Sequence, residues 1–205
     1  MTLARVATLA ALTTLLAGPA VAQMPVPGAA DLSRVAAGTY AADPAHTQVG
    51  WRLNHLGFSS YDGLFGGMTG TMTIDPARPA ATTVAVTIPI GGLVTTVPAL
   101  DTHLKSPDFF DAAKFPTATF TSTSVTIRGP QARIAGTLTL HGVSRPVVLD
   151  ARFVGAGTNP LTKKATVGFA ATTTIKRSDF GMAFYVPAVG DDVALTINAA
   201  FERGN

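Results

Sequence analysis

Apolar and polar residues alternate along most of this chain, most clearly between residues 132 and 153. Two alternating segments, 132–140 and 147–153, flank the turn-like sequence His141-Gly142-Val143-Ser144. A period of two is typical of antiparallel strands that bury one face and expose the other to water. The same pattern recurs between short connections and predicts about eight long strands, at residues 46–57, 68–74, 84–90, 117–128, 132–140, 147–153, 165–175 and 193–201.

Strands of this kind close either as an up-and-down barrel or as a two-sheet sandwich. A sandwich core packed to native density needs large side chains, whereas eight strands in a barrel leave room for one small ligand. Many residues with inward phase are small, namely Gly70, Ala132, Gly136, Ala151, Ala165, Ala171 and Ala199. The pattern therefore favours an all-β, eight-stranded antiparallel barrel with an interior cavity over a sandwich.

Two segments depart from regular alternation. Residues 98–114 predict a short helical excursion, in which Ser106 followed by Pro107 is typical of a helix N-cap with proline in the first turn. Helical spacing is also seen earlier in this segment, for Leu100, His103 and Leu104. The apolar phase changes after Phe120, which predicts a β-bulge near residues 122–124.

The first 22 residues predict a secretory signal peptide, since the basic Arg5 precedes an apolar run and the cleavage site Ala20-Val21-Ala22. The apolar run is too short for a stable membrane span, so we expect an exported protein without stable membrane insertion. The chain divides into a signal peptide (1–22), an extended N-terminal tail (23–37) and a barrel domain (38–203).

The composition narrows the function classes. Of the 205 residues, 13% are charged, about half the usual share, and none is cysteine. Disulfides therefore play no part, and no cysteine is available for a lipid anchor. The 15 basic residues are scattered rather than gathered in a stripe, so we expect no nucleic-acid partner.

Templates for catalysis and metal binding are missing from the sequence. It contains no H-x-x-x-H, H-E-x-x-H or G-x-S-x-G motif, and no glycine-rich loop followed by Lys-Ser/Thr. We interpret His46 and His141 as residues that shape turns. The sequence therefore predicts neither an enzyme nor a metal site nor a cofactor.

Two polar residues remain as candidates for a role at the cavity. His55 shares its inward phase with Trp51 and Leu53, so its imidazole either contacts the polar head of a ligand or is satisfied by neighbouring protein groups. Arg177 ends a strand, where it either pins a loop or guards the mouth of the barrel. Three carboxylates are near enough in sequence to form an ion pair with it at the barrel rim, those of Asp179, Asp191 and Asp192.

The chain resembles the YceI-like, polyisoprenoid-binding family in an ordered series of motifs across residues 38–203. Each motif is weak alone, but their order is specific. They are Tyr40-Ala41-Ala42-Asp43-Pro44-Ala45-His46-Thr47, Leu53-Asn54-His55-Leu56-Gly57, Ser106-Pro107-Asp108-Phe109-Phe110-Asp111, Lys114-Phe115-Pro116, Phe120-Thr121-Ser122-Thr123, Leu138-Thr139-Leu140-His141-Gly142-Val143-Ser144-Arg145-Pro146-Val147, Arg177-Ser178-Asp179-Phe180-Gly181 and Val189-Gly190-Asp191. Two departures could alter the shape of the pocket: Trp51, where the family more often has phenylalanine, and the segment 91–95.

The resemblance implies an exported, lipocalin-like antiparallel barrel that holds a long isoprenoid chain without covalent attachment. An isoprenoid quinone or its precursor is the expected ligand, and the periplasm is the expected location. The oligomeric state stays open, with a homodimer as one alternative. From their inward phase and the motifs, we predict that the pocket is lined by Trp51, Leu53, His55, Phe120, Ile134, Gly136, Leu138, Leu149, Phe169, Ala171, Ile175 and Phe180.

Two other readings compete with a periplasmic lipid carrier. The barrel could be filled by its own side chains and act as a structural or stress-protective module. An enzyme acting on a hydrophobic substrate would require an acidic partner for His55 within the pocket.

Overall fold

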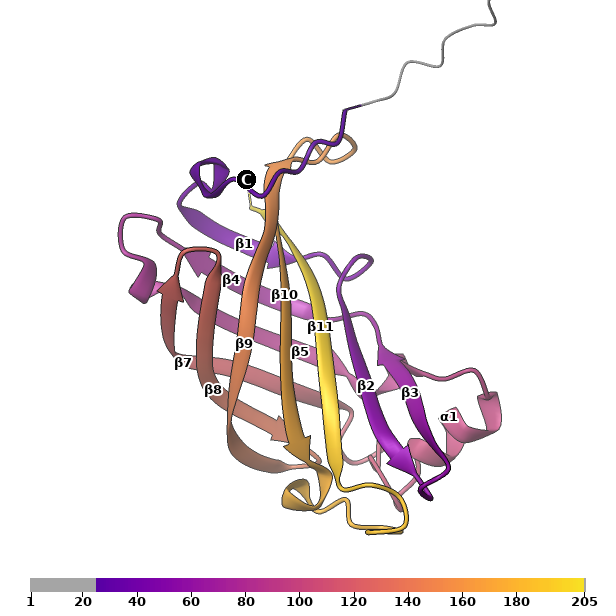
Figure 1. Ribbon diagram of the computed structural model, residues 1–205. Coiled ribbons are helices and arrows are strands. Elements are labelled where there is room, and N and C mark those ends of the chain that lie inside the picture. Colours follow the sequence, from indigo (N-terminus) through magenta and orange to yellow (C-terminus); the bar gives the residue numbers. More distant parts are fainter. Residues whose placement is uncertain (1–24, 205) are drawn as a thin grey trace, which may run out of the picture.

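The computed structural model describes residues 25–204, so the predicted signal peptide lies outside the described residues. These residues form one antiparallel sheet of eleven strands, shown in Figure 1. The strands are β1 (Gly38–Ala42), β2 (Gln48–His55), β3 (Ser59–Phe65), β4 (Thr69–Ile74), β5 (Thr83–Pro89), β6 (Leu93–Val94), β7 (Thr117–Arg128), β8 (Gln131–Leu140), β9 (Val143–Thr158), β10 (Ala165–Lys176) and β11 (Asp192–Arg203). The helical elements are α1 (Pro98–Leu104) and the 3-10 turns η1 (Leu32–Arg34), η2 (Pro79–Ala81), η3 (Ile90–Gly92) and η4 (Arg177–Phe180).

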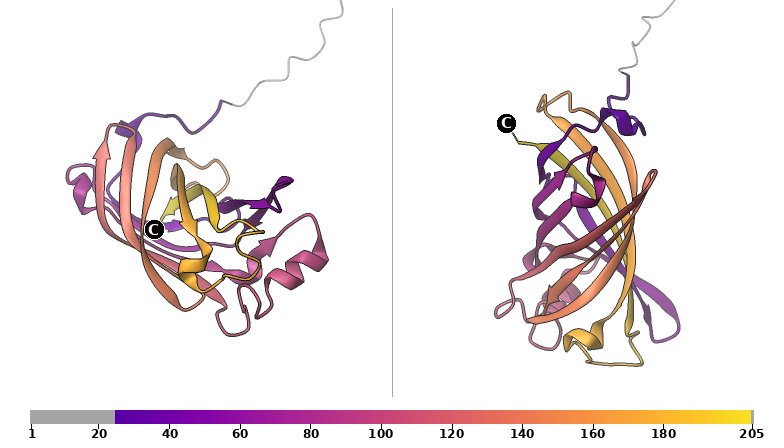
Figure 2. Two further views of the ribbon diagram at one scale, coloured as in Figure 1. Left: turned by 60° about the horizontal axis from the view of Figure 1, so that its bottom comes forward. Right: turned by 90° about the vertical axis from the view of Figure 1, so that its left-hand side faces the viewer.

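Eight strands close into the predicted antiparallel barrel. The ring runs β1-β4-β5-β7-β8-β9-β10-β11 and closes because β1 pairs with both β4 and β11. Figure 2 shows these strands curving around a common axis. The remaining strands, β2, β3 and β6, continue the sheet from β11 beyond the ring. The prediction of eight barrel strands is therefore confirmed, but the set of strands differs. The segment 46–57 forms β2, which lies outside the ring, and β1 takes its place in the ring.

A tight turn joins β1 to β2 and lets β11 change partner along its length. At this turn the hydroxyl of the fully buried Thr47 accepts a hydrogen bond from the Ala200 N–H (3.1 Å) and donates one to its carbonyl (3.2 Å). The side chain thus satisfies main-chain groups that neither strand reaches. His46 Nδ1 lies 2.6 Å from the Asp43 carboxylate, so His46 shapes this turn as predicted.

The alternating segments around residue 141 form the predicted hairpin. Leu140 of β8 pairs with Val143 of β9 across His141 and Gly142, which both have positive φ angles, +52° and +73°. Two consecutive residues of this kind match the right-handed twist of the paired strands. The register shift between Ser122 and Ser124 of β7 confirms the predicted bulge.

The helical excursion is shorter than predicted. Helix α1 ends at Leu104, and the chain continues as tight turns in which the Ser106 carbonyl accepts from the N–H groups of Phe109 and Asp111. The predicted helix N-cap at Ser106 was wrong, because these turns close on the end of α1 instead. The Phe110 N–H, for example, donates to the Leu104 carbonyl at 3.0 Å.

The segment that precedes β1 lies against one end of the barrel. Ala29 and Ala156 of β9 exchange two main-chain hydrogen bonds of 3.0 and 2.9 Å. Gly157 makes this approach feasible, since a Cβ at that position would overlap the Pro27 carbonyl. The 3-10 turn η1 follows, capped by the Asp31 carboxylate, which accepts from the Ser33 N–H. We call residues 25–37 the N-terminal strap.

Candidate functional site

The barrel interior contains two adjoining cavities. The first has a volume of about 300 Å³ and the second about 250 Å³, which is close to the lower end of the range for small-molecule sites. Four side chains line both cavities and so mark the waist between them, Val49, Ile88, Leu138 and Leu195. The two cavities therefore lie end to end along the barrel.

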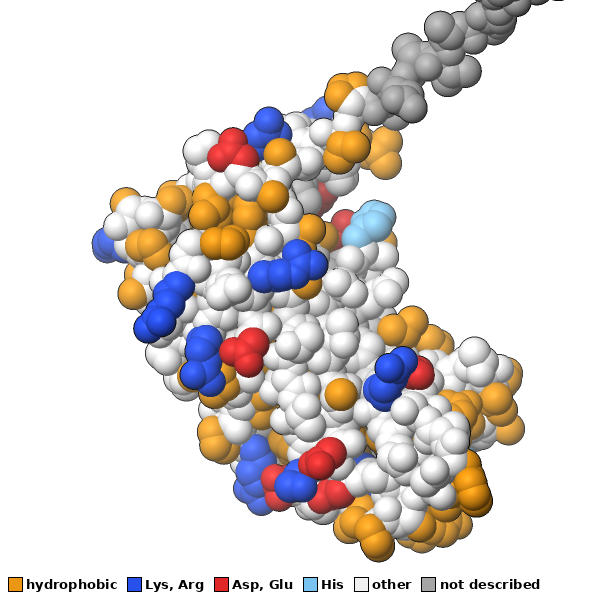
Figure 3. All heavy atoms as spheres, viewed as in Figure 1, with side chains coloured by type: hydrophobic (Ala, Val, Ile, Leu, Met, Phe, Trp, Pro, Cys, Tyr) orange, Lys and Arg blue, Asp and Glu red, His pale blue; other side chains and the backbone are white. Residues whose placement is uncertain are grey.

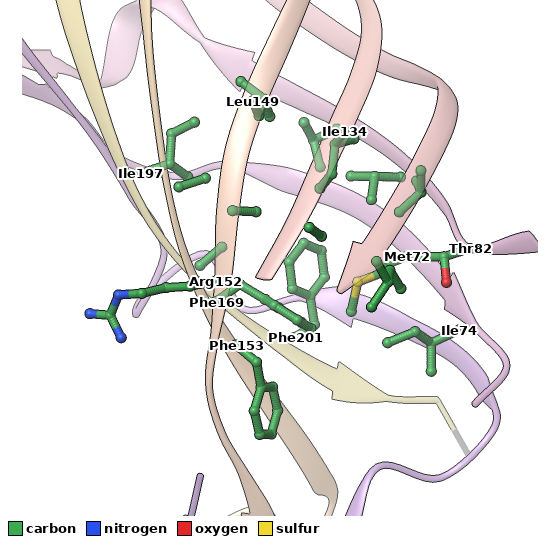
Figure 4. A pocket seen from close by; sticks show the side chains of 18 of the residues that line it. Met72, Ile74, Thr82, Ile134, Leu149, Arg152, Phe153, Phe169, Ile197 and Phe201 are labelled. Atoms are coloured by element: carbon green, nitrogen blue, oxygen red, sulfur yellow. The ribbon is translucent and has the colours of Figure 1, made fainter. Parts of the chain in front are cut away.

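The first cavity lies toward the N-terminal strap. Leu32 and Val35 of the strap line it, together with the turns that join β4 to β5 and β7 to β8. Figure 4 shows its aliphatic and aromatic walls, and shows the Arg152 side chain extending away from the other labelled residues. The hydroxyl of Thr82, also on this wall, has no hydrogen-bond partner within residues 25–204. The wall is otherwise almost entirely apolar.

The second cavity lies between the end of the barrel, α1 and the loop 181–190. Aromatic rings pack in a chain across this end: His103 and Phe109 have centroids 5.0 Å apart, Phe109 and Phe184 5.6 Å, and Phe184 and Tyr185 4.2 Å. His103, Phe109 and Tyr185 also line the cavity. Its wall, like that of the first, is almost entirely apolar.

Trp51 lies on the wall of the second cavity, and a glycine on β3 accommodates it. A Cβ on Gly63 would overlap the indole ring of Trp51, so this strand pair requires glycine opposite tryptophan. The indole stacks on Tyr61 with a centroid distance of 6.3 Å. Its Nε1–H is buried and finds no acceptor within residues 25–204. Trp51 therefore contributes to the cavity wall through the packing of its ring, and its indole N–H remains without a hydrogen bond.

His55 lies where its phase predicts, at the end of β2 on the wall of the second cavity. Its main chain bridges to Val189, and its ring is 6.2 Å from that of Tyr61. Within the described chain its ring contacts Tyr61 rather than a carboxylate. Because His55 is only partly buried, water can satisfy its imidazole when no ligand is present.

Most of the predicted pocket residues line the two cavities. Those at the first cavity are Phe120, Ile134, Leu149, Phe169 and Ala171, those at the second are Trp51, Leu53, His55 and Ile175, and Leu138 lines both.

Gly136 and Phe180 line neither cavity, so their assignment to the pocket was wrong. The ring of Phe120 occupies the space in front of Gly136, where a Cβ would overlap both this ring and the Thr121 carbonyl. Phe180 belongs to η4 rather than to a strand and is 2% exposed. Its carbonyl accepts a hydrogen bond from His141 Nδ1 at 3.1 Å, which ties η4 to the β8–β9 turn.

Several lining residues were missed because they lie outside the alternating strands. Leu32 and Val35 stand three residues apart in a tail of mostly small residues, and that spacing is the signal that could have pointed to them. His103 and Tyr185 lie on the excursions that cover the second cavity, where no strand period applies.

Arg177 pins a loop, but not by the predicted rim ion pair. Its side chain is 5% exposed, and its guanidinium donates to the carbonyls of Gly190 (2.9 Å), Met182 (2.7 Å) and Val189 (2.8 Å). Burial lowers the pKa of Arg177 from its ordinary value, and attraction to Asp191 opposes this. The carboxylates could not take these positions because the loop carbonyls already converge on the guanidinium.

Asp191 instead fixes the start of η4. Its carboxylate accepts from the Ser178 N–H at 2.9 Å and from the Ser178 hydroxyl at 2.8 Å. Burial raises the pKa of Asp191, but the hydrogen bonds from Ser178 and the charges of Lys176 and Arg177 outweigh burial and hold this pKa below its ordinary value. Both residues therefore hold the loop that covers the second cavity.

Within residues 25–204 no group of three or more His, Asp or Glu side chains is placed to hold a metal ion. No helix in this part of the chain is long and apolar enough to cross a membrane. The chemistry that the walls offer is the burial of hydrocarbon.

These features define a class of protein: a closed antiparallel barrel built around an elongated apolar interior. The model of the YceI-like domain matches residues 40–201, and the chain belongs to this family. A UPF0312 protein of Vibrio cholerae is 40% identical over 172 residues, which cover 82% of this chain and 88% of that protein. The crystal structure of the YceI protein of Campylobacter jejuni is 34% identical with a TM-score of 0.65, covering 74% of this chain and 90% of that one.

A third relative shares the fold at low identity. It is a polyisoprenoid binding domain from Saccharophagus degradans, 13% identical, with a TM-score of 0.58, covering 82% of this chain and 100% of that domain.

Proposed function

We propose that this protein is a periplasmic carrier that sequesters the isoprenoid chain of a lipid, such as an isoprenoid quinone or its precursor. The observation that carries the proposal is the pair of apolar cavities that meet at the waist of Val49, Ile88, Leu138 and Leu195. An elongated interior with apolar walls suits a long, branched hydrocarbon better than a compact polar metabolite. The predicted signal peptide supports the location.

The binding mechanism is exclusion of water. Each methylene-sized group that leaves water contributes about 0.8 kcal/mol, and ordering of the chain offsets much of this gain. Selectivity then depends on chain length and on how the methyl branches fit the wall. The polyisoprenoid binding named for the Saccharophagus degradans domain, which has the same fold, supports this assignment.

His55 is the group proposed to contact the polar head of the ligand. It lines the second cavity, is only partly buried and has no protein partner among the described residues, so a quinone oxygen would replace water as the partner of its imidazole. Replacing His55 with leucine should preserve the fold and the binding of plain polyprenes. Preference for a polar head should fall by about 1 kcal/mol. A drop in melting temperature with unchanged preference would instead assign His55 a structural role.

Lipid analysis of gently purified protein tests the proposal. Protein isolated from its native compartment without detergent should yield, on extraction and mass spectrometry, a lipid whose mass fits a series of isoprene units. Recovery of protein that is consistently free of lipid, and that takes none up from solubilised polyprenol, would favour a barrel filled by its own side chains. Turnover of a bound hydrophobic molecule would favour an enzyme.

A further inference from the structure

The end of the barrel that holds the second cavity carries unusually exposed apolar side chains. On the β2–β3 turn, Leu56 is 48% and Phe58 91% exposed, and on the facing loop Phe184 is 41% and Tyr185 59% exposed. We call these four residues the apolar rim. Figure 3 shows hydrophobic side chains gathered over this lower end and over the neighbouring α1 and β3. Contiguous exposed apolar surface on a protein of this size marks an interaction site.

The two segments that bear the rim are joined to one another by main-chain hydrogen bonds. The Leu56 N–H donates to the Ala188 carbonyl at 2.9 Å, and the Gly190 N–H donates to the Asn54 carbonyl at 2.8 Å. Arg177 holds the same loop through the three carbonyls described above. The rim side chains are therefore presented by a fixed backbone.

The loop side of the rim borders the second cavity. Tyr185 belongs to both, and Phe184 contacts Phe109, which also lines the cavity. An apolar path thus leads from the exposed surface to the interior of the barrel.

Charge is missing from three segments at this end, and the charged residues Lys176, Asp191 and Asp192 lie beside the last of them. Residues 53–61, 88–100 and 180–190 contain no Asp, Glu, Lys or Arg. Leu64, Val94 and Val97, which are 42%, 49% and 45% exposed, extend the exposed apolar surface along β3, β6 and the start of α1, beside the ion pair of Arg52 with Asp62. Uncharged segments with exposed Phe and Tyr match the interfacial zone of a bilayer, where aromatic side chains are enriched and buried charges are costly.

We propose that the apolar rim docks on the surface of a lipid bilayer, so that a lipid chain passes between the membrane and the second cavity. The role of this docking surface in lipid transfer rests on the proposed carrier function. Membrane binding itself can be measured without any lipid in the cavity. Because the rim carries no charge, binding should depend on burial of apolar surface rather than on attraction to anionic lipids. Salt should therefore affect it little.

Co-sedimentation with vesicles of zwitterionic phosphatidylcholine tests the docking. The wild-type protein should co-sediment equally well at low and high salt. Phe58→Asp should reduce the bound fraction by about tenfold or more, since it places a charge where an aromatic ring enters the bilayer. Leu161→Asp is the matched control, because Leu161 is 87% exposed on the β9–β10 turn at the opposite end. It should bind vesicles as the wild type does.

Three results would overturn the proposal. In the first, the wild type does not co-sediment with the vesicles. In the second, Phe58→Asp binds the vesicles as well as the wild type does. In the third, the rim is covered by a second copy of the chain. The last would appear in sedimentation velocity as a dimer that Phe58→Asp converts to a monomer. Uptake of polyprenol from detergent separates the two hypotheses: Phe58→Asp should still load there, whereas failure of every variant to load would count against the carrier function itself.

Discussion

Filling the first cavity by mutation separates a ligand site from ordinary core. Ala171 on β10 lines this cavity, and its neighbour on β9 in the sheet, Ala151, is also small and lines it. In Ala171→Phe the added phenyl ring would occupy space that a ligand chain otherwise fills. We expect the fold to tolerate this change, because the ring enters existing space and buries apolar surface.

The expected loss of affinity follows from the size of the ring. A phenyl group displaces about four to six methylene-sized groups of a bound chain, each contributing about 0.8 kcal/mol. The loss of about 3–5 kcal/mol corresponds to a decrease in affinity of about 100- to 4000-fold for a chain that spans both cavities. Shorter chains that fit the second cavity alone should bind almost unchanged.

Gly136→Ala is the matched comparison, because the structure places Gly136 behind Phe120 rather than on the cavity. A single methyl group there overlaps the Thr121 carbonyl, so unfolding free energy should fall by about 1–3 kcal/mol while chain binding is retained. Melting curves and binding of polyprenes of graded length provide the assay. If Ala171→Phe unfolds the protein yet leaves binding of long chains intact, the ligand does not occupy the first cavity.

Further predictions test the strap and the loop. Arg177→Met should lower the unfolding free energy by about 3 kcal/mol, since one buried and two partly buried carbonyls lose their donors; unchanged denaturant curves would contradict this. Ala29→Cys with Ala156→Cys should form a disulfide, since residues that exchange both main-chain hydrogen bonds lie within disulfide reach and the chain has no other cysteine; persistent free thiols would show that the strap lies elsewhere. Because the folded-state pKa of Asp191 is depressed, its hydrogen bonds with Ser178 stabilise the fold above about pH 4 and are lost as the pH falls through the folded pKa. The stability difference between wild type and Asp191→Asn should therefore vanish at low pH; a constant difference would refute this role.

Local patterns predicted the hairpins well, because two-residue alternation and turn chemistry act over short distances. His141 and Gly142 adopt the positive φ angles that a tight turn needs, and the phase change after Phe120 became the bulge. Closure of the ring depended on a long-range pairing instead. The five residues of β1 are too few to show a period, and their partner β11 lies at the far end of the chain.

The candidate site was predicted where strand phase decides which way a side chain points. His55 and Trp51 reach the cavity for this reason. Phase cannot show whether another side chain stands in front of an inward residue, which is why Gly136 was misassigned. It also says nothing about segments outside the strands, such as the strap residue Leu32 and the Arg177 loop, whose positions follow from tertiary packing.

Binding of polyprenes of increasing length, followed by the fluorescence of Trp51, tests the central claim most directly. Trp51 is the only tryptophan in the chain and lies on the wall of the second cavity, so it reports occupancy without a label. If one chain fills both cavities, the signal should saturate at one ligand per protein, and affinity should rise with each isoprene unit until the interior is full and then level off. No saturable signal at any chain length, or an affinity independent of length, would contradict the account.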